Sequence, residues 1–432
     1  MERDLLKSRL AKLPDLPPID PDRHLELTDD DKAEEALDSF DPTAPAVLKP
    51  RRRPLGVSYS PLSAEGYFTT ALEVDSLVRS VYQPLNASST APASSDSSGT
   101  AVFRVYYTPP PAPPPSSPAT ISSSFGLSAS GATEDEEEGG GGNGVVFVCV
   151  HGAGYSGLSW ACLAKELAER TQGKSRVGIL AYDARGHGKT RLPLPAEGES
   201  DIVDMSLQTM AQDLCALLKT MYPDRDSAPS LVLVGHSMGG AVVAEACNRV
   251  QEDVADVTGV VVVDVVEGTA LEALSGMSAL IAAHPKKFSS PEEAILWHIQ
   301  SKTINNVDSA RVSVPPLVKP LHEGASNYGW RVDLQKTEPY WRGWFAGLSA
   351  RFLSCKAAKL LLLAGTDRLD RELLIGQMQG KYQLEVDPLV GHCVHEDAPG
   401  RTADTLLSFW QRNDRTDMAQ ILRRVKKVGD PA

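Results

Sequence analysis

The stretch LVLVGHSMGGAVVAEA, residues 231–246, decides the fold of this chain. An apolar run typical of a buried strand enters Gly-His-Ser-Met-Gly-Gly, and an alanine-rich pattern typical of a helix follows. Gly235 and Gly239 flank Ser237 and remove the Cβ atoms that would collide in a sharp strand-to-helix turn. Such a turn exposes the serine oxygen as a nucleophile, and the alternative is a serine that only caps a helix.

Short β-rich apolar runs recur along the chain and alternate with helical patterns. The expected strands are 100–108, 145–150, 177–182, 231–235, 259–264, 359–365 and 382–386. The clearest expected helices are 158–170, 207–222 and 401–412. Continuous apolar strands that alternate with helices predict an α/β fold, in which a mostly parallel sheet has helices on both faces.

The rest of the chain is divided by composition. We expect a mostly disordered leader at 1–65, a catalytic domain at 66–412 and a C-terminal tail at 413–432. A segment rich in Pro, Ser, Gly and acidic residues predicts a flexible insert at 109–144. About 90 residues with an aromatic stretch separate two of the expected strands, which predicts an inserted helical cap at 265–355.

Charge and cysteine usage exclude several classes of protein. The formal net charge of −13, from 43 basic and 56 acidic residues, argues against binding to nucleic acid or to an anionic membrane. The six cysteines show no paired spacing, which indicates reduced thiols in a cytoplasmic or nuclear protein. The N-terminus has no signal-like apolar stretch, and no window approaches 18 consecutive apolar residues.

A reactive serine of this kind needs a base and an acid later in the chain. His392 is the first histidine after the last expected strand, and His395 is interpreted as a neighbouring polar residue. There are two candidate acids. Asp264 ends the expected strand 259–264, and Asp367 follows the expected strand 359–365. Sequence spacing alone does not choose between them.

The loops around the serine supply candidate hydrogen-bond donors. Met238 N–H at the start of the helix and Ala153 N–H in His-Gly-Ala-Gly (151–154) are the expected oxyanion donors. The same glycine-rich loop lacks the Lys-Ser/Thr of a phosphate-binding loop. Four further polar residues are expected to support loop geometry: His151, Asp183, His187 and His236.

Six segments add a family resemblance. They are GHSMGGA (235–241), VVDVVEGTALEAL (262–274), INNVDSARVS (304–313), KTEPYWRGWFAGLS (336–349), LLLLAGTDRLDRELLIGQMQGKYQ (360–383) and GHCVHEDAP (391–399). Together they closely resemble the protein phosphatase methylesterase 1 family, over most of 145–412. The resemblance implies an α/β-hydrolase fold and removal of the methyl ester from the C-terminal leucine of the protein phosphatase 2A catalytic subunit.

Carried over by motif, the family's nucleophile falls on Ser237, its acid on Asp264 and its base on His392. The resemblance therefore favours Asp264 over Asp367. It implies acyl transfer through an acyl-enzyme, without a metal or organic cofactor. The chain departs from the family pattern in its long insert and leader and in His-Gly-Ala-Gly, where three successive glycines would be expected.

The aromatic residues of the expected cap are candidates for contact with the phosphatase tail. They are Trp330, Tyr340, Trp341 and Trp344. The alternative is that they pack in the cap's own core. Two other functions stay open: another serine hydrolase such as a lipase, thioesterase or general carboxylesterase, and a non-catalytic inhibitor that binds the phosphatase. Hydrolases with an aspartate nucleophile are excluded, since serine occupies the turn.

Overall fold

The computed structural model describes residues 57–79, 82–84, 98–112, 144–172, 175–195, 199–365 and 369–414. Most of the expected leader, insert 109–144 and tail 413–432 lies outside these ranges. Asp367, the second candidate acid, also lies outside them.

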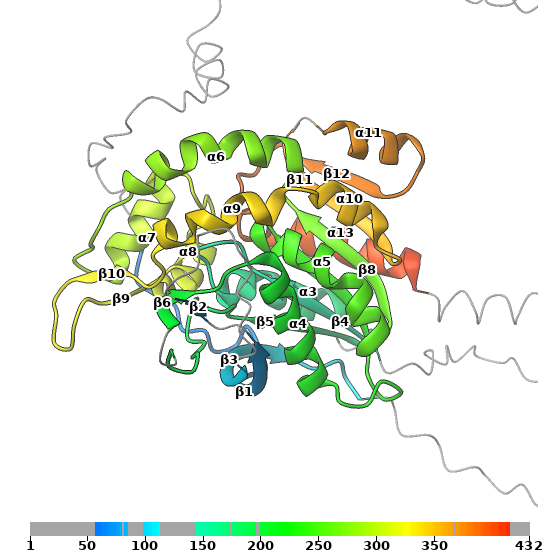
Figure 1. The fold of residues 1–432 in the computed structure, drawn as a ribbon, viewed down its shortest axis with the longest axis horizontal. Coiled ribbons are helices and arrows are strands. Elements are labelled where there is room, and N and C mark those ends of the chain that lie inside the picture. Colours follow the sequence, from blue (N-terminus) through cyan, green and yellow to red (C-terminus); the bar gives the residue numbers. More distant parts are fainter. Residues whose placement is uncertain are drawn as a thin grey trace, which may run out of the picture. The chain divides into compact units, whose positions relative to one another are not determined.

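An eight-stranded sheet forms the centre of the fold (Figure 1), in the order β1-β3-β5-β4-β7-β8-β11-β12. Its strands are β1 (Thr70–Arg79), β3 (Ser98–Thr108), β4 (Val145–Val150), β5 (Val177–Tyr182), β7 (Ser230–His236), β8 (Val257–Val263), β11 (Ala358–Ala364) and β12 (Gln383–Asp387). The pairs β1–β3 and β3–β5 are antiparallel, and the pairs from β5 through β12 are parallel. The predicted α/β fold with a mostly parallel sheet is confirmed.

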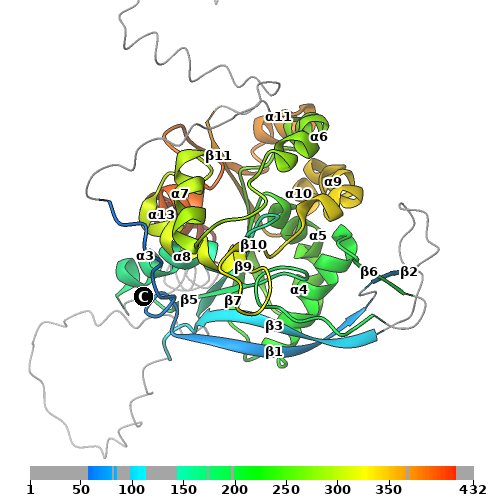
Figure 2. The same ribbon diagram turned by 90° about the vertical axis from the view of Figure 1, so that its left-hand side faces the viewer.

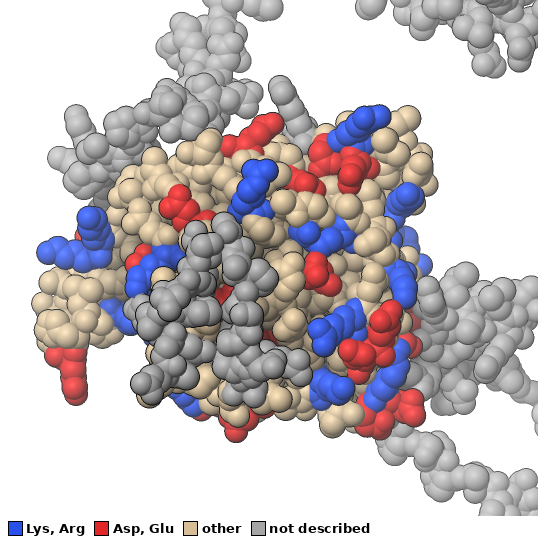
Figure 3. Space-filling view, in the orientation of Figure 1, with Lys and Arg blue, Asp and Glu red and all other residues tan. Residues whose placement is uncertain are grey.

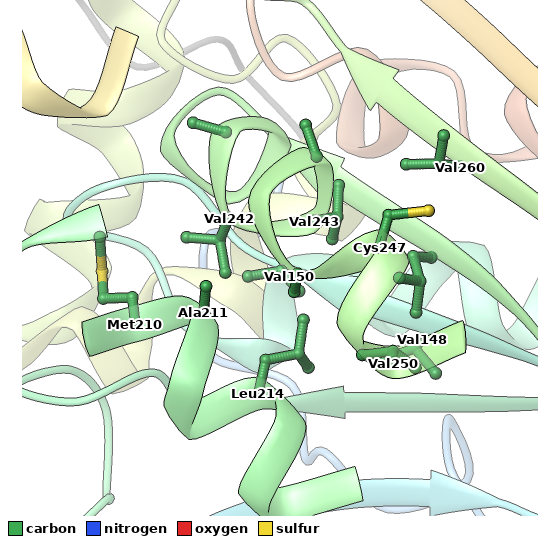
Figure 4. Packing of buried hydrophobic residues seen from close by; sticks show 14 of the residues in the cluster. Val148, Val150, Met210, Ala211, Leu214, Val242, Val243, Cys247, Val250 and Val260 are labelled. Carbon is green, nitrogen blue, oxygen red and sulfur yellow. The ribbon is translucent and has the colours of Figure 1, made fainter. Parts of the chain in front are cut away.

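Helices cover both faces of this sheet because its inner strands, such as β4 and β5, are buried at every position. Alternate residues of β4 belong to two separate hydrophobic clusters. Val148 faces the helices α4 (Leu207–Met221) and α5 (Met238–Asp253), as Figure 4 shows. Phe147 belongs to the cluster on the opposite face, with α3 (Ala161–Thr171) and α13 (Pro399–Asn413). Burial on two faces explains the absence of polar alternation in these strands.

The chain between β8 and β11 is largely helical. It contains α6 (Glu267–Ala282), α7 (Pro291–Gln300), α8 (Val307–Ser313), η2 (Pro315–Leu317), β9 (Val318–Pro320), β10 (Tyr328–Trp330), η3 (Leu334–Thr337), α9 (Glu338–Phe345) and α10 (Leu348–Ser354). Helix α10 packs on α5, and α8 packs on α3 and on η1 (Gly157–Trp160). In Figures 1 and 2, α6 lies beside α11 (Arg371–Met378). This segment therefore contributes to the packing around the sheet as well as to the surface above it.

A pair of short strands and one short helix complete the fold. The short strands β2 (Tyr82–Pro84) and β6 (Glu199–Val203) pair antiparallel, and α12 (Val394–Asp397) precedes α13.

Within the described ranges, no helix has the length and apolar character needed to cross a membrane. Acidic and basic side chains are interspersed on the face seen in Figure 3.

Residues at the end of the expected leader contact the helical segment. Leu62 N–H donates to the carbonyl of Arg311 in α8 at 2.9 Å, and Arg311 Nε donates to the carbonyl of Ser60 at 2.8 Å. Tyr59 is buried in a cluster with Phe288. The described part of the leader, 57–65, is thus attached to α8.

Candidate active site

Ser237 occupies a strained turn between β7 and α5. Its φ of +52° and ψ of −117° lie in a region that non-glycine residues rarely adopt. The turn is tight on both sides, because a Cβ on Gly235 would lie 2.1 Å from the carbonyl oxygen of Gly239. A Cβ on Gly239 would lie 2.2 Å from the carbonyl oxygen of Val150. Ser237 N–H donates to Val263 O at 2.9 Å, which ties the turn to the end of β8.

His392 and Asp264 meet at the carboxyl ends of the strands. His392 Nδ1 lies 2.6 Å from Asp264 Oδ2. The other carboxylate oxygen of Asp264 accepts from Ala364 N–H at 2.7 Å, and Asp264 N–H donates to Leu362 O at 2.8 Å. Strand β11 therefore holds Asp264 in place and leaves one carboxylate oxygen for the imidazole. With Nδ1 donating to this oxygen, Nε2 is the nitrogen that can accept a proton.

The two side chains differ in exposure. The Asp264 side chain is 10% exposed, whereas the His392 side chain is 51% exposed, so water and substrate have access to the imidazole. Among the hydrogen bonds between described side chains, none joins His392 to Ser237 Oγ. Catalytic hydrogen bonds are commonly long in the absence of substrate and tighten when it binds.

His236 contacts the backbone of His392. Its Nε2–H donates to the carbonyl oxygen of His392 at 2.9 Å. Burial, followed by the nearby rings of His392 and His395, holds the pKa of His236 well below its usual value. A neutral imidazole at this position donates through Nε2 without adding charge beside His392.

Two other buried histidines hold the loop that passes the serine. His151 Nε2 accepts from Ala184 N–H at 3.0 Å, and its Nδ1–H donates to Gly152 O at 2.7 Å. His187 Nε2 accepts from Gly154 N–H at 2.9 Å. Burial lowers the pKa of His151 to about 3 and that of His187 to about 4. Both rings are therefore neutral at physiological pH and act as hydrogen-bond partners of the backbone.

The candidate oxyanion donors lie on either side of Ser237. A Cβ on Gly152 would lie 3.4 Å from Ser237 Cβ, so the loop that contains Ala153 passes directly beside the serine. Met238 is the first residue of α5. Within the described part of the chain, neither Met238 N–H nor Ala153 N–H has a hydrogen-bond acceptor. Both N–H groups are thus available to a developing oxyanion.

A carboxylate and an ion pair brace the loop after β5. Asp183 accepts from Gly157 N–H at 2.8 Å and from Lys189 N–H at 2.7 Å. Burial raises the pKa of Asp183, and these two N–H groups act in the opposite direction. Arg185 forms a fully buried bidentate pair with Asp213 in α4, at 2.6 and 2.7 Å. Sequence reasoning assigned no role to this pair, because its members are 28 residues apart and no local pattern links them.

Three of the aromatic candidates lie in the interior. Tyr340, Trp341 and Trp344 are 8%, 5% and 2% exposed, and they belong to the main hydrophobic cluster. Tyr340 OH donates to Val203 O at 3.3 Å, and Trp344 Nε1–H donates to Met205 O at 2.7 Å. The Trp341 indole donates to the hydroxyl four residues earlier, at 2.8 Å. These contacts pack α9 on the core, which is the alternative that the sequence left open.

Trp330 lies elsewhere and is half-buried. Its Nε1–H donates to Pro285 O at 2.7 Å, and its ring centroid lies 5.2 Å from that of Phe288 and 5.6 Å from that of Trp297. It is the most exposed of the four aromatic candidates.

The described side chains around the site form no metal-binding arrangement. In the described ranges, no group of three or more His, Cys, Asp or Glu side chains is placed to hold a metal ion.

A surface hollow of about 380 Å³ beside Tyr107, Arg176 and Tyr222 contains none of the candidate active-site residues.

Comparison with known proteins gives the family. Residues 147–405 match the model of the alpha/beta hydrolase family. A protein phosphatase methylesterase 1 from Cryptococcus neoformans var. neoformans is 41% identical over 437 residues, which cover 98% of this chain and 94% of that protein. The chain belongs to the protein phosphatase methylesterase 1 family. The enzyme of that name from Emericella nidulans is 46% identical, over 63% of this chain and 69% of that protein.

Solved structures agree on the fold. E-2-(acetamidomethylene)succinate hydrolase aligns with a TM-score of 0.50 at 18% identity, over 72% of this chain and 96% of that one. A peroxisomal alpha-beta-hydrolase from Saccharomyces cerevisiae aligns with a TM-score of 0.51 at 13% identity, over 84% of this chain and 92% of that one. The predicted family resemblance and the α/β-hydrolase fold are both confirmed.

Proposed function

We propose that this chain is a serine carboxylesterase that removes the methyl ester from the C-terminal leucine of the protein phosphatase 2A catalytic subunit. One observation carries the chemistry: the 2.6 Å contact between His392 and Asp264 beside the strained turn at Ser237. The name of the relative that aligns over 94% of its length supports the substrate.

The proposed first step is acylation. Ser237 Oγ attacks the leucine ester carbonyl while His392 Nε2 takes the serine proton, and Asp264 stabilises the imidazolium through Nδ1. The tetrahedral intermediate collapses, the bond from carbonyl carbon to methoxy oxygen breaks, and methanol leaves with the proton from His392. The leucine carbonyl is then esterified to Ser237.

The second step is hydrolysis of this acyl-enzyme. Water loses a proton to His392 and attacks the same carbonyl, and this proton passes to Ser237 Oγ as the leucine carboxylic acid is released and loses its own proton to solvent. Met238 N–H and Ala153 N–H would donate to the oxyanion in both steps. Removal of one such donor in comparable enzymes costs about 3 to 4 kcal/mol of transition-state stabilisation. No step needs a metal or an organic cofactor.

Recognition of the partner stays a prediction. Trp330 is the aromatic candidate whose partial exposure suits contact with a phosphatase tail. Tyr340, Trp341 and Trp344 would reach such a tail only after α9 moved, because their side chains are buried. We also propose a cytoplasmic or nuclear location, from the cysteine usage of the sequence.

The test is incubation with methylated phosphatase and mass analysis of its C-terminal peptide. The wild-type chain should remove about 14 mass units, the difference between a methyl ester and an acid, and Ser237→Ala should not. Ser227→Ala is the matched control, since Ser227 is exposed and its hydroxyl donates to the local carbonyl of Asp224. An unchanged peptide mass with the wild-type chain, or equal demethylation by Ser237→Ala, would contradict the proposal.

A further inference from the structure

The backbone around the base is held by a carboxylate that the proposed mechanism does not use. Asp397 Oδ2 accepts from the N–H of Gly391, the residue before His392, at 2.8 Å. The same oxygen accepts from Asn305 Nδ2 at 2.6 Å, and Asp397 Oδ1 accepts from Asn305 N–H at 2.7 Å. One side chain thus joins the backbone before His392 to the turn between α7 and α8.

The chemistry of this contact suits only a carboxylate. All three groups that point at Asp397 are N–H donors, and a deprotonated carboxylate accepts at both oxygens. An amide at this position would place its NH₂ group against at least one of these donors. The space is also limited, because a Cβ on Gly391 would lie 3.0 Å from Asn305 Nδ2 and 3.2 Å from Asp397 Oδ2.

The contact matters because few groups orient the imidazole itself, chiefly Asp264 at 2.6 Å and the His236 ring at 4.6 Å between centroids. The His392 side chain is 51% exposed, so packing confines the imidazole only partly. Its position therefore also depends on its backbone, which is held on two sides. Asp397 accepts from the N–H of Gly391, and His236 donates to the carbonyl of His392. A second link fixes the same short helix, since Ser309 Oγ in α8 donates to the carbonyl that precedes Asp397 at 2.7 Å.

We infer that Asp397 and Asn305 form a clamp that positions His392 against Asp264. They are positioning residues, since neither is placed to touch the reacting atoms. The clamp ties the base to the helical segment between β8 and β11, through Asn305. The inference rests on the proposed function, because it takes His392 as the general base.

The test compares Asp397→Ala, Asp397→Asn, Asn305→Ala and the Asp397→Ala/Asn305→Ala double variant with the full-length wild-type chain. The substrates are a peptide that ends in leucine methyl ester and a small chromogenic ester. Misplacement of a catalytic group by about 1 Å costs roughly 100-fold in rate, so kcat should fall about 10- to 100-fold for both esters. KM should change less than about threefold, because the substrate contacts stay in place.

Two further readouts separate positioning from loss of folding. The rate at which a fluorophosphonate forms the Ser237 Oγ–phosphorus bond and releases fluoride needs the base but not the methyl ester, and it should fall in parallel with kcat. The double variant should be no slower than Asp397→Ala, because both substitutions remove the same contact. Asp404→Asn is the control, since the Asp404 carboxylate pairs with Arg170 on the surface and should leave kcat unchanged.

The outcomes distinguish the two hypotheses. If the wild-type chain reacts with the fluorophosphonate but leaves the methyl ester intact, the proposed function is wrong, and the labelling rates still decide the clamp. The clamp is overturned if the Asp397 variants, folded by circular dichroism, label Ser237 and turn over at the wild-type rate. It is also overturned if the losses of the two single variants multiply in the double variant. Should Asp397→Ala fail to fold, Asp397→Asn and Asn305→Ala carry the same comparison.

Discussion

Replacement of Glu396 by glutamine should remove a loss of stability at alkaline pH. Glu396 lies in α12 with no exposed surface. Burial raises the pKa of its carboxyl to about 8; the nearby Ser313 hydroxyl acts in the opposite direction, and the neighbouring Asp397 raises the pKa further. Glutamine has nearly the same shape and is neutral at every pH, so Glu396→Gln isolates the effect of the charge.

The sign follows from proton binding in the two states. The unfolded chain releases this proton near pH 4.5, whereas the folded chain keeps it up to about pH 8. Between these values the folded state binds more protons, so the free energy of unfolding falls as pH rises through the folded pKa. Integration of the folded-state titration from pH 6.5 to 8 gives a loss of about 2 kcal/mol.

The comparison begins at pH 6.5 because, below this pH, the buried histidines change the free energy of unfolding in the opposite direction. Burial lowers the pKa of His151 and His395 to about 3 and that of His187 to about 4. The stability that these neutral rings contribute is present above pH 6.5 and is lost as pH falls towards 4 and 3. These groups together predict greatest stability near pH 6.5 for the wild-type chain.

The assay is thermal unfolding followed by circular dichroism between pH 6.5 and 8. Relative to the wild type, Glu396→Gln should gain about 2 kcal/mol across this window, which corresponds to a Tm difference of about 2 to 3 °C for a domain of this size. Glu272→Gln, at an exposed position in α6, is the control and should follow the wild type. Parallel curves for Glu396→Gln and the wild type would refute a buried, protonated Glu396.

Three other predictions test the acid, the turn and the buried ion pair. Asp264→Asn should lower kcat about 10³- to 10⁴-fold in the methyl-ester assay, because the amide no longer selects the correct tautomer of His392. Gly239→Ala should destabilise the chain by about 3 kcal/mol or more in chemical denaturation, since its Cβ would lie 2.2 Å from a carbonyl oxygen. Gly276→Ala is the comparison, because Gly276 lies in α6 and a Cβ there would have no atom within 4 Å. It should be neutral or stabilise the chain by about 0.5 to 1 kcal/mol. Asp213→Asn should cost about 3 to 5 kcal/mol in urea unfolding, because it leaves a buried guanidinium without its charge partner.

Each of these has a clear contrary result. A kcat for Asp264→Asn within tenfold of wild type would return the role of acid to Asp367. Equal stability of Gly239→Ala and Gly276→Ala would mean that the turn tolerates a side chain. A loss below about 1 kcal/mol for Asp213→Asn would show that the pair with Arg185 contributes little.

The sequence by itself determined the features that depend on local pattern. The apolar runs at 145–150 and 177–182 are strands with those same bounds, because continuous apolar residues of this length fit a strand buried on both faces. The turn at Ser237 was predictable for a similar reason, since glycines two residues on either side leave room for it. The family resemblance rested on segments spread across the chain, and the comparisons confirm it.

Only the tertiary structure decided how distant residues meet. His392 and Asp264 are 128 residues apart, and strand order in the sheet brings them to 2.6 Å. The antiparallel strand β1 was not predicted, because its own residues do not indicate that it pairs with β3. The burial of Trp344 and the contact of Asp397 with Asn305 likewise arise from chain segments that no local periodicity relates. Local propensity and glycine placement act over a few residues, whereas side-chain pairing depends on the packing of the whole domain.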